Sequence, residues 1–250
     1  MASSTSSATG TTKYFVLSRP VNVRTDDNRD NHILHVNSGH RQVFLLPEVN
    51  LDYYWRKGMF ECQLMEWSKQ FCKPDKLFLD IGAHTGTYAI SLASKCREVV
   101  AFEPQKATYY ALCGSVAMSG LSDRITCHRI GLGSDDQAGE QVLKIVSNDG
   151  GGSSLAPAEH ETTLREESIE VRTLDSFGLK DVGFIKMDVE NNELNVLRGA
   201  LDTLRESGYP SILFESNEAN PALFGFLKEA LQYKIVPVGG MANMFLACKE

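Results

Sequence analysis

Apolar residues recur at helical spacing in one part of the chain and as short runs elsewhere. Leu194, Leu197, Leu201 and Leu204 form one stripe at 3.6-residue spacing, which predicts a single helix over 191–206. Strands are expected at 76–80, 98–103, 124–130, 183–188 and 211–215, and further helices near 85–95 and 105–119. Because strands alternate with helices, the pattern predicts an α/β fold with a mostly parallel, doubly wound sheet.

The N-terminal part has a different pattern. Residues 1–12 are rich in Ser, Thr, Ala and Gly and are predicted to be a disordered tail. A small β appendage is expected over 13–58, because short β-rich runs are separated by turn residues at 14–17, 32–36 and 42–46. A helix is expected from about 59 to 72, and it begins the main domain, 59–250.

Two later segments also break the alternation. The segment 141–174 is interpreted as an insertion, in which strands at 141–146 and 168–174 flank the glycine-rich loop N-D-G-G-G-S-S at 148–154. The runs 234–238 and 244–248 are separated only by G-G-M-A-N. So short a connection cannot form a parallel crossover, and the two runs are therefore predicted to pair as an antiparallel hairpin.

Composition narrows the class of protein. The chain has 250 residues, 42% hydrophobic residues and a formal net charge of −7, which argues against a broad nucleic-acid or anionic-membrane surface. Its six cysteines include no C-x-x-C pair, so free thiols in a reducing compartment such as the cytoplasm are expected. There is no apolar run of about 20 residues, and the first residues lack the pattern of a signal peptide.

The stretch L-F-L-D-I-G-A-H-T-G, residues 77–86, predicts a strand that ends in a glycine bend before a helix. This geometry presents backbone N–H groups at the carboxyl edge of the sheet, where open α/β sheets bind ligands. A P-loop is excluded because no Lys follows Gly86. A pyrophosphate is disfavoured because His84 stands where a dinucleotide site needs its second glycine.

Two acids at strand ends complete the predicted ligand site. Glu103 follows the second strand and suits the two hydroxyls of a ribose, while Asp80 remains available for a cationic group. S-adenosylmethionine, a nucleoside with an amine and no phosphate, fits this set. The alternative is a bend that only packs a helix on a strand.

The ordered series of sequence blocks resembles FkbM-type methyltransferases. The blocks are L-D-I-G-A-H-T-G, A-F-E-P, V-R-T-L-D-S-F, I-K-M-D-V-E-N-N-E-L-N-V-L-R-G-A and P-S-I-L-F-E, and the resemblance covers about 58–215. It implies a class I methyltransferase fold, Rossmann-like, with a seven-stranded sheet and S-adenosylmethionine as cofactor. It also implies transfer of methyl to a hydroxyl of a sugar, glycan or other small natural product. The cofactor-binding residues implied are Asp80, Gly82, His84, Thr85 and Gly86 for the methionine part, Glu103 and Pro104 for the ribose, and Gly131 for the adenine.

Catalysis is assigned to two acids at the end of the fourth strand. Asp188 is expected to be the base or hydroxyl-orienting group, with Glu190 in support, although Glu190 could instead only stabilise a helix N-terminus. Glu215 and His160 are candidate substrate contacts. No metal site is expected, because the sequence places no third ligand beside Asp188 and Glu215.

Two other functions remain open. Asp188 and Glu215 also fit an RNA 2′-O-methyltransferase, although the acidic charge counts against RNA. A catalytically inactive, nucleoside-binding partner subunit is the second alternative. The chain departs from the family pattern at Asn191, where a glycine is usual, and at Gly114 and Met118, where asparagines are often found.

Overall fold

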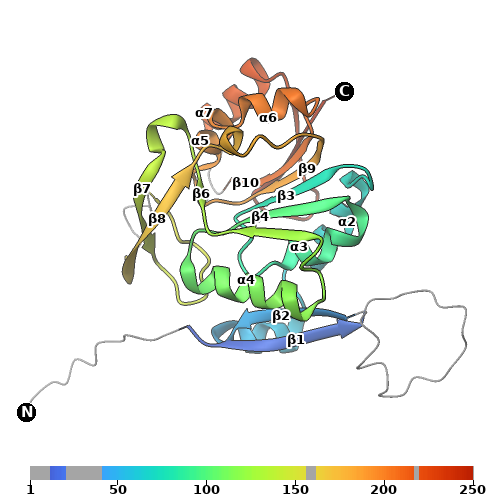
Figure 1. The fold of residues 1–250 in the computed structure, drawn as a ribbon, viewed down its shortest axis with the longest axis vertical. Coiled ribbons are helices and arrows are strands. Elements are labelled where there is room, and N and C mark those ends of the chain that lie inside the picture. Colours follow the sequence, from blue (N-terminus) through green and yellow to red (C-terminus); the bar gives the residue numbers. More distant parts are fainter. Residues whose placement is uncertain (1–11, 21–40, 156–161, 217–219, 250) are drawn as a thin grey trace, which may run out of the picture.

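The computed structural model of the protein describes residues 12–20, 41–155, 162–216 and 220–249. A central sheet lies between two helical layers (Figure 1). One layer is formed by α2 (Cys62–Ser68), α3 (Thr87–Leu92) and α4 (Lys106–Met118), and the other by α5 (Glu193–Arg198), α6 (Leu201–Glu206) and α7 (Pro221–Gly225). Each layer packs its own hydrophobic cluster against one face of the sheet.

Among the described residues, seven strands form the central sheet in the order β11-β12-β10-β9-β3-β4-β5. Their bounds are β3 Leu77–Ile81, β4 Glu98–Phe102, β5 Ile125–His128, β9 Val182–Met187, β10 Ser211–Glu215, β11 Lys234–Pro237 and β12 Met244–Cys248. Strands β5, β4, β3, β9 and β10 are parallel, whereas β12 is antiparallel to both β10 and β11. The predicted doubly wound sheet and its C-terminal antiparallel hairpin are therefore confirmed.

The strand order reverses at β3, which lies between β4 and β9. In open α/β sheets, such a reversal leaves a crevice beyond the carboxyl ends of the strands. The residues that follow β3 and β9 are therefore placed where a ligand would be expected.

The N-terminal segment contains a hairpin of β1 (Tyr14–Pro20) and β2 (Arg41–Pro47), which lies beneath α4 (Figure 1). Phe44 and Leu46 are fully buried in the same hydrophobic cluster as the helices on that side. The hairpin approaches α4 closely, since a Cβ atom on Gly114 would lie 2.5 Å from Leu45 Cδ1. The predicted tail and the strand expected at 32–36 lie outside the described residues, apart from Thr12.

The predicted insertion contains a small second sheet beside the central one. Strand β8 (Arg165–Arg172) pairs with β7 (Gly139–Ile145) and with the two-residue β6 (Gly131–Leu132). The two strands expected at 141–146 and 168–174 are thus present with shifted bounds. Two 3₁₀ turns flank this sheet, η5 (Asp135–Gln137) and η6 (Leu174–Phe177), and two others, η3 (Lys69–Phe71) and η4 (Ala93–Lys95), follow α2 and α3.

The single helix predicted over 191–206 is wrong, because α5 and α6 are separate and Leu201 is 40% exposed. The break lies at Gly199, where a Cβ atom would come within 2.1 Å of the Gly133 carbonyl oxygen. The side chain of Asp175 then accepts hydrogen bonds from the N–H groups of Asp202 and Thr203, which begins a new helix. A contact between distant segments therefore overrides the local leucine pattern.

Other helices differ from expectation more modestly. The helix expected at 59–72 begins only at Cys62 and ends as a 3₁₀ turn. The β appendage also contains η2 (Glu48–Asn50) and α1 (Leu51–Lys57), and a π-helical turn, η7 (Phe226–Ala230), follows α7. The part of the chain that the structure describes contains no helix of sufficient length and apolarity to cross a membrane.

Candidate active site

The bend after β3 is held by the neighbouring strands. Gly82 and Ala83 both donate backbone hydrogen bonds to the Phe102 carbonyl, at 3.0 and 2.9 Å. Gly82 has φ +74, and a Cβ atom there would lie 1.8 Å from the Asp188 carbonyl oxygen. The bend therefore needs glycine at this position both for its conformation and for its close approach to the end of β9.

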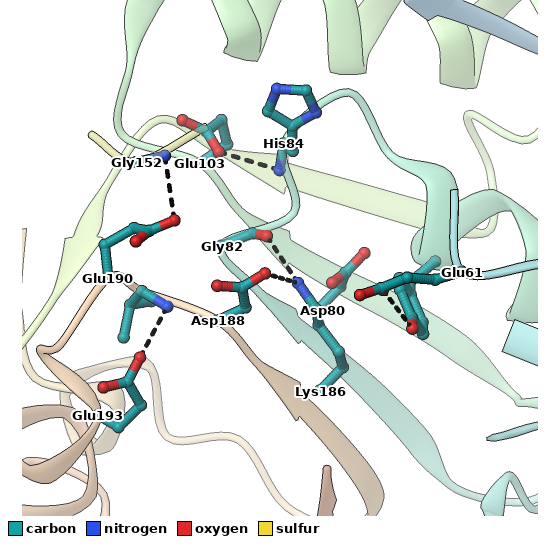
Figure 2. A network of polar contacts seen from close by, with 12 residues as sticks. Glu61, Asp80, Gly82, His84, Glu103, Gly152, Lys186, Asp188, Glu190 and Glu193 are labelled. Atoms are coloured by element: carbon teal, nitrogen blue, oxygen red, sulfur yellow. Dashed lines mark hydrogen bonds and ion pairs between the residues drawn. The ribbon is translucent and has the colours of Figure 1, made fainter. Parts of the chain in front are cut away.

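Glu103 lies at the end of β4 with its carboxylate fixed over the bend (Figure 2). Its Oε2 accepts a hydrogen bond from the His84 backbone N–H at 3.0 Å, and its Oε1 accepts one from the Gln105 N–H at 2.9 Å. Burial raises the pKa of this carboxyl to about 7. Each oxygen keeps a free lone pair, so the carboxylate can accept two further hydrogen bonds from a ligand.

His84 connects the bend to the insertion. Its Nε2 lies 2.7 Å from the Asp149 carbonyl oxygen, which can only accept, so Nε2 carries the proton. Its Nδ1 then accepts a long, 3.4 Å contact from the hydroxyl of Thr85. Burial lowers the pKa of His84, which favours the neutral ring. His84 therefore holds the loop 148–154 against the bend.

A cavity opens between this bend and the insertion. It is lined by apolar side chains of both sheets and by a few polar groups: Ile81, Phe102, Pro104, Ile130, Leu132, Leu143, Leu155, Val189 and Ile169, with His84, Glu103, Ser153, Asp188, Glu190 and Asn192, and the glycines 82, 131, 150, 151 and 152. A mostly apolar wall with convergent polar groups is the usual character of a small-molecule site.

Lys186 and Asp188 form an ion pair at the end of β9 (Figure 2). Lys186 Nζ donates to Asp188 Oδ2 and to the Gly82 carbonyl oxygen, both at 3.2 Å. Lys186 is only 5% exposed, and the carboxylates of Asp188 and Asp80 raise its pKa despite its burial. One buried cation therefore fixes both the bend and the predicted catalytic carboxylate.

Glu190 and Glu193 surround the chain just beyond Asp188. Glu190 Oε1 accepts a hydrogen bond from the Gly152 N–H at 3.0 Å, so its carboxylate holds the glycine-rich loop. Glu193 Oε1 accepts one from the Val189 N–H at 3.1 Å, and burial raises the pKa of Glu193 to about 7. Both contacts shape the turn that presents Asp188 to the cavity.

Several predicted site residues lie beside the cavity without lining it. Thr85 is fully buried, and Gly86 has φ +90 and immediately precedes α3. Asp80 is 1% exposed; its Oδ2 accepts a hydrogen bond from the Ala89 N–H at 2.8 Å, while its Oδ1 has no hydrogen-bond partner within the described chain. Glu215 is half-buried at the end of β10, and His160 lies outside the described residues.

The structure adds residues that the sequence did not assign to the site. Lys186 stands two residues before Asp188 in a strand, so its side chain lies on the same face, and this K-x-D spacing was the signal available. Glu61 lies just before α2 and Tyr88 lies in α3, and no local pattern links them to Lys186. Among the described residues, no group of three or more His, Cys, Asp or Glu side chains could hold a metal ion, and the six cysteines are free thiols.

Comparisons with known proteins identify the family. The family model described as methyltransferase FkbM domain matches residues 80–234. The chain is 25% identical over 151 residues to methyltransferase 1 of Beauveria bassiana (strain ARSEF 2860), covering 51% of this chain and 59% of that protein. It is 29% identical over 130 residues to methyltransferase sdnD of Sordaria araneosa, covering 51% of this chain and 47% of that protein.

Among solved structures, methyltransferase FkbM from Methylobacillus flagellatus KT is similar, with a TM-score of 0.49 and 21% identity over 70% of this chain and 44% of that one. The chain spans about half the length of the curated relatives that it matches. The family-model match covers more than half of the chain and includes the bend, Glu103 and Asp188. The chain therefore belongs to the methyltransferase FkbM domain family, whose cofactor is S-adenosylmethionine.

Proposed function

We propose that the chain is an S-adenosylmethionine-dependent O-methyltransferase that acts on a hydroxyl of a sugar, glycan or small natural product. The observation that carries this proposal is the position of Asp188. Its carboxylate is fixed by Lys186 at 3.2 Å, and it lines the same cavity as Glu103, whose carboxylate is proposed to accept hydrogen bonds from the ribose. The proposed base and the proposed nucleoside site therefore lie at the same edge of the central sheet.

The residues of the cavity suit the cofactor. Glu103 offers two carboxylate oxygens to the ribose hydroxyls, because each oxygen is occupied by only one backbone N–H. Ile130 and Leu132 offer apolar contacts to an adenine beside Gly131. Gly82 brings the chain close to Asp188 without a side chain between them. When bound, the cofactor supplies a methyl group on a positively charged sulfur.

The chain's own residues would align the acceptor and remove its proton. Lys186 occupies Oδ2 of Asp188, so Oδ1 is the atom that accepts the hydroxyl proton. Asp188 would orient the acceptor hydroxyl toward the methyl group that the bound cofactor would supply, and it would take up the hydroxyl proton. Lys186 also binds the Gly82 carbonyl oxygen, which fixes the distance between the bend and the base.

Glu190 is proposed to act through the insertion. Its bond to the Gly152 N–H holds the loop that lines the cavity, and Ser154 donates its hydroxyl to the Glu190 carbonyl oxygen at 2.8 Å. These contacts support a role in excluding water from the site. Asn192, and not Glu190, precedes the first residue of α5, so a role for Glu190 limited to the helix N-terminus is less favoured.

The test is a labelled-methyl transfer assay against glycans, nucleotide sugars and capped RNA. We expect transfer to a sugar hydroxyl, and a loss of about 10²- to 10⁴-fold in kcat for Asp188→Asn, the usual range for a general base. The dissociation constant for S-adenosylhomocysteine should change little. Asp202→Asn is the matched control, because Asp202 pairs with Arg205 on the surface.

Three results would contradict the proposal in different ways. Full activity of Asp188→Asn would show that Asp188 is not the base. Transfer to RNA alone would replace the sugar acceptor with the 2′-O-methyltransferase alternative. Absence of S-adenosylhomocysteine binding to the wild-type chain would overturn the methyltransferase activity itself.

A further inference from the structure

A second set of polar side chains, which includes Lys186 and Glu61, lies on the opposite side of Gly82 from Glu103 (Figure 2). We call it the Lys186 cluster, and it consists of Lys186 with Glu61, Tyr88, Asp188 and Glu215. Glu215 lies beside Asp188, because Phe214 of β10 pairs with Met187 of β9 in parallel register. Asp188 is the member of the cluster that also lines the cavity described above. The cluster therefore adjoins the cofactor cavity through the catalytic carboxylate.

Glu61 is held in place by buried groups. The hydroxyl of Tyr88 donates to Glu61 Oε2 at 2.7 Å, and the ring of Tyr88 lies 5.3 Å from Lys186 Nζ. Glu61 also has φ +52, a left-handed conformation that is unfavourable for a non-glycine residue. The backbone and the buried tyrosine together direct this carboxylate toward Lys186, as Figure 2 shows.

The cluster has more acceptors than donors. Burial, with the carboxylates of Asp188, Glu190 and Glu61 nearby, raises the pKa of Glu215 to about 7. An independent observation is the buried carboxylate of Asp80, which Figure 2 places beside Lys186 and Glu61, and whose Oδ1 has no hydrogen-bond partner among the described residues. Carboxylates gathered in this number around one lysine favour a ligand that brings hydrogen-bond donors.

We propose that Glu61 binds the methyl acceptor, and that with Glu215 it selects a neutral, polyhydroxylated molecule of the sugar class. This inference rests on the proposed function, because Asp188 would take the proton from the same acceptor. Several hydroxyl donors satisfy the excess of carboxylate oxygens without adding charge. One hydroxyl reaches Asp188, and its neighbours reach Glu61 and Glu215.

The segment that leads into Glu61 supports a sugar. Tyr53 and Phe60 stack with ring centroids 3.8 Å apart, and Trp55 is 85% exposed. Phe60 directly precedes Glu61 in the chain, so this stacked pair lies next to the residue that is proposed to bind the acceptor. A sugar ring presents apolar C–H groups on its faces and hydroxyls at its edge, so it can contact these rings while its hydroxyls reach Glu61.

The test measures acceptor and cofactor separately in the full chain. Tritiated S-adenosylmethionine is supplied with neutral mono- and oligosaccharides, or with the polyamine spermidine. For the sugar that is methylated best, Glu61→Gln should raise KM about tenfold or more, since a hydrogen bond to a charged group is worth about 1.5 to 3 kcal/mol. We expect kcat to fall less than KM rises, and the dissociation constant for S-adenosylhomocysteine to stay the same.

Two further variants separate binding from folding. Tyr88→Phe removes the hydroxyl that positions Glu61, so it should raise KM in the same direction with a smaller effect on kcat. Glu66→Gln, in the helix that begins just after Glu61, is the matched control because Glu66 pairs with Lys69 at the surface. The Tm of each variant reports whether the fold is kept.

The possible results have different meanings. An unchanged KM in Glu61→Gln, methyl transfer to spermidine alone, or no transfer to any sugar by a chain that binds S-adenosylhomocysteine would each overturn this inference. Weaker S-adenosylhomocysteine binding in Glu61→Gln would assign the cluster to the cofactor and also overturn it. A wild-type chain that does not bind S-adenosylhomocysteine would overturn the proposed function, and this inference with it.

Discussion

Two features of the structure require glycine at position 82: the left-handed φ of this residue and its close contact with the Asp188 carbonyl oxygen. Gly82→Ala should lower the free energy of unfolding by about 1 to 2 kcal/mol through its φ and by about 1 to 3 kcal/mol more through overlap with that carbonyl. Urea unfolding of the purified variant measures this loss. Gly208→Ala is the matched control, because Gly208 has the same φ of +74 and nothing within 4 Å of a Cβ atom. Equal losses in both variants would show that the contact with Asp188 contributes nothing.

Single residues were predictable from the sequence where a strand end fixed their position. Glu103 and Asp188 follow strands, and both line the cavity. Glu61 could not be predicted, because it lies before α2 and its carboxylate is held by the hydroxyl of Tyr88 in α3. Asn191, the departure from the family's glycine, has φ +72, and asparagine tolerates this conformation better than most residues. The substitution therefore keeps the turn after Asp188.

At the scale of elements, the contact between β2 and α4 depends on two buried serines. The N–H groups of Val43 and Leu45 donate to the hydroxyls of Ser119 and Ser115, both at 2.9 Å. Ser119→Ala should cost about 1 to 3 kcal/mol of unfolding free energy, because it leaves the Val43 N–H buried without a partner. Chemical denaturation measures this cost.

Ser168→Ala provides the comparison for that variant, since Ser168 is exposed and donates to Glu140 across a strand pair. Its effect should stay within about 0.5 kcal/mol, as is usual for surface substitutions. If Ser119→Ala were equally mild, water would have to satisfy the Val43 N–H, and the Ser119 bond would contribute little beside the Ser115 bond and the buried Phe44 and Leu46.

The elements themselves were predictable where the pattern was local. The five parallel strands and the C-terminal hairpin follow from short apolar runs and from the length of one connection. The break between α5 and α6 could not be predicted, because it depends on a contact with the carbonyl of Gly133, over 60 residues away along the chain. Gly114 has a similar explanation. It stands where the family often has asparagine, and any side chain there would meet Leu45 of the hairpin.

At the scale of the whole molecule, buried acids couple the site to the stability of the fold. Burial raises the pKa of Glu103 to about 7 from its ordinary value of 4.5, so the folded chain keeps this proton at pH values where the unfolded chain has lost it. The protonated carboxyl of Glu103 therefore makes its full contribution to the free energy of unfolding below about pH 4.5, and this contribution is lost as the pH rises toward 7. The site is thus least stable where its carboxylate is ready to bind.

The difference between wild type and Glu103→Gln isolates this carboxyl from the other titrating groups. Relative to the variant, wild-type unfolding free energy should fall by about 2 to 3 kcal/mol between pH 5 and pH 8, at about 1.36 kcal/mol for each pH unit of difference between the two pKa values. Urea unfolding at both pH values measures it. S-adenosylhomocysteine should bind more tightly at pH 8 than at pH 6, because ribose hydroxyls donate to the ionised form of Glu103. Parallel pH profiles for wild type and variant would contradict the raised pKa, whereas pH-independent binding would remove Glu103 from the ribose.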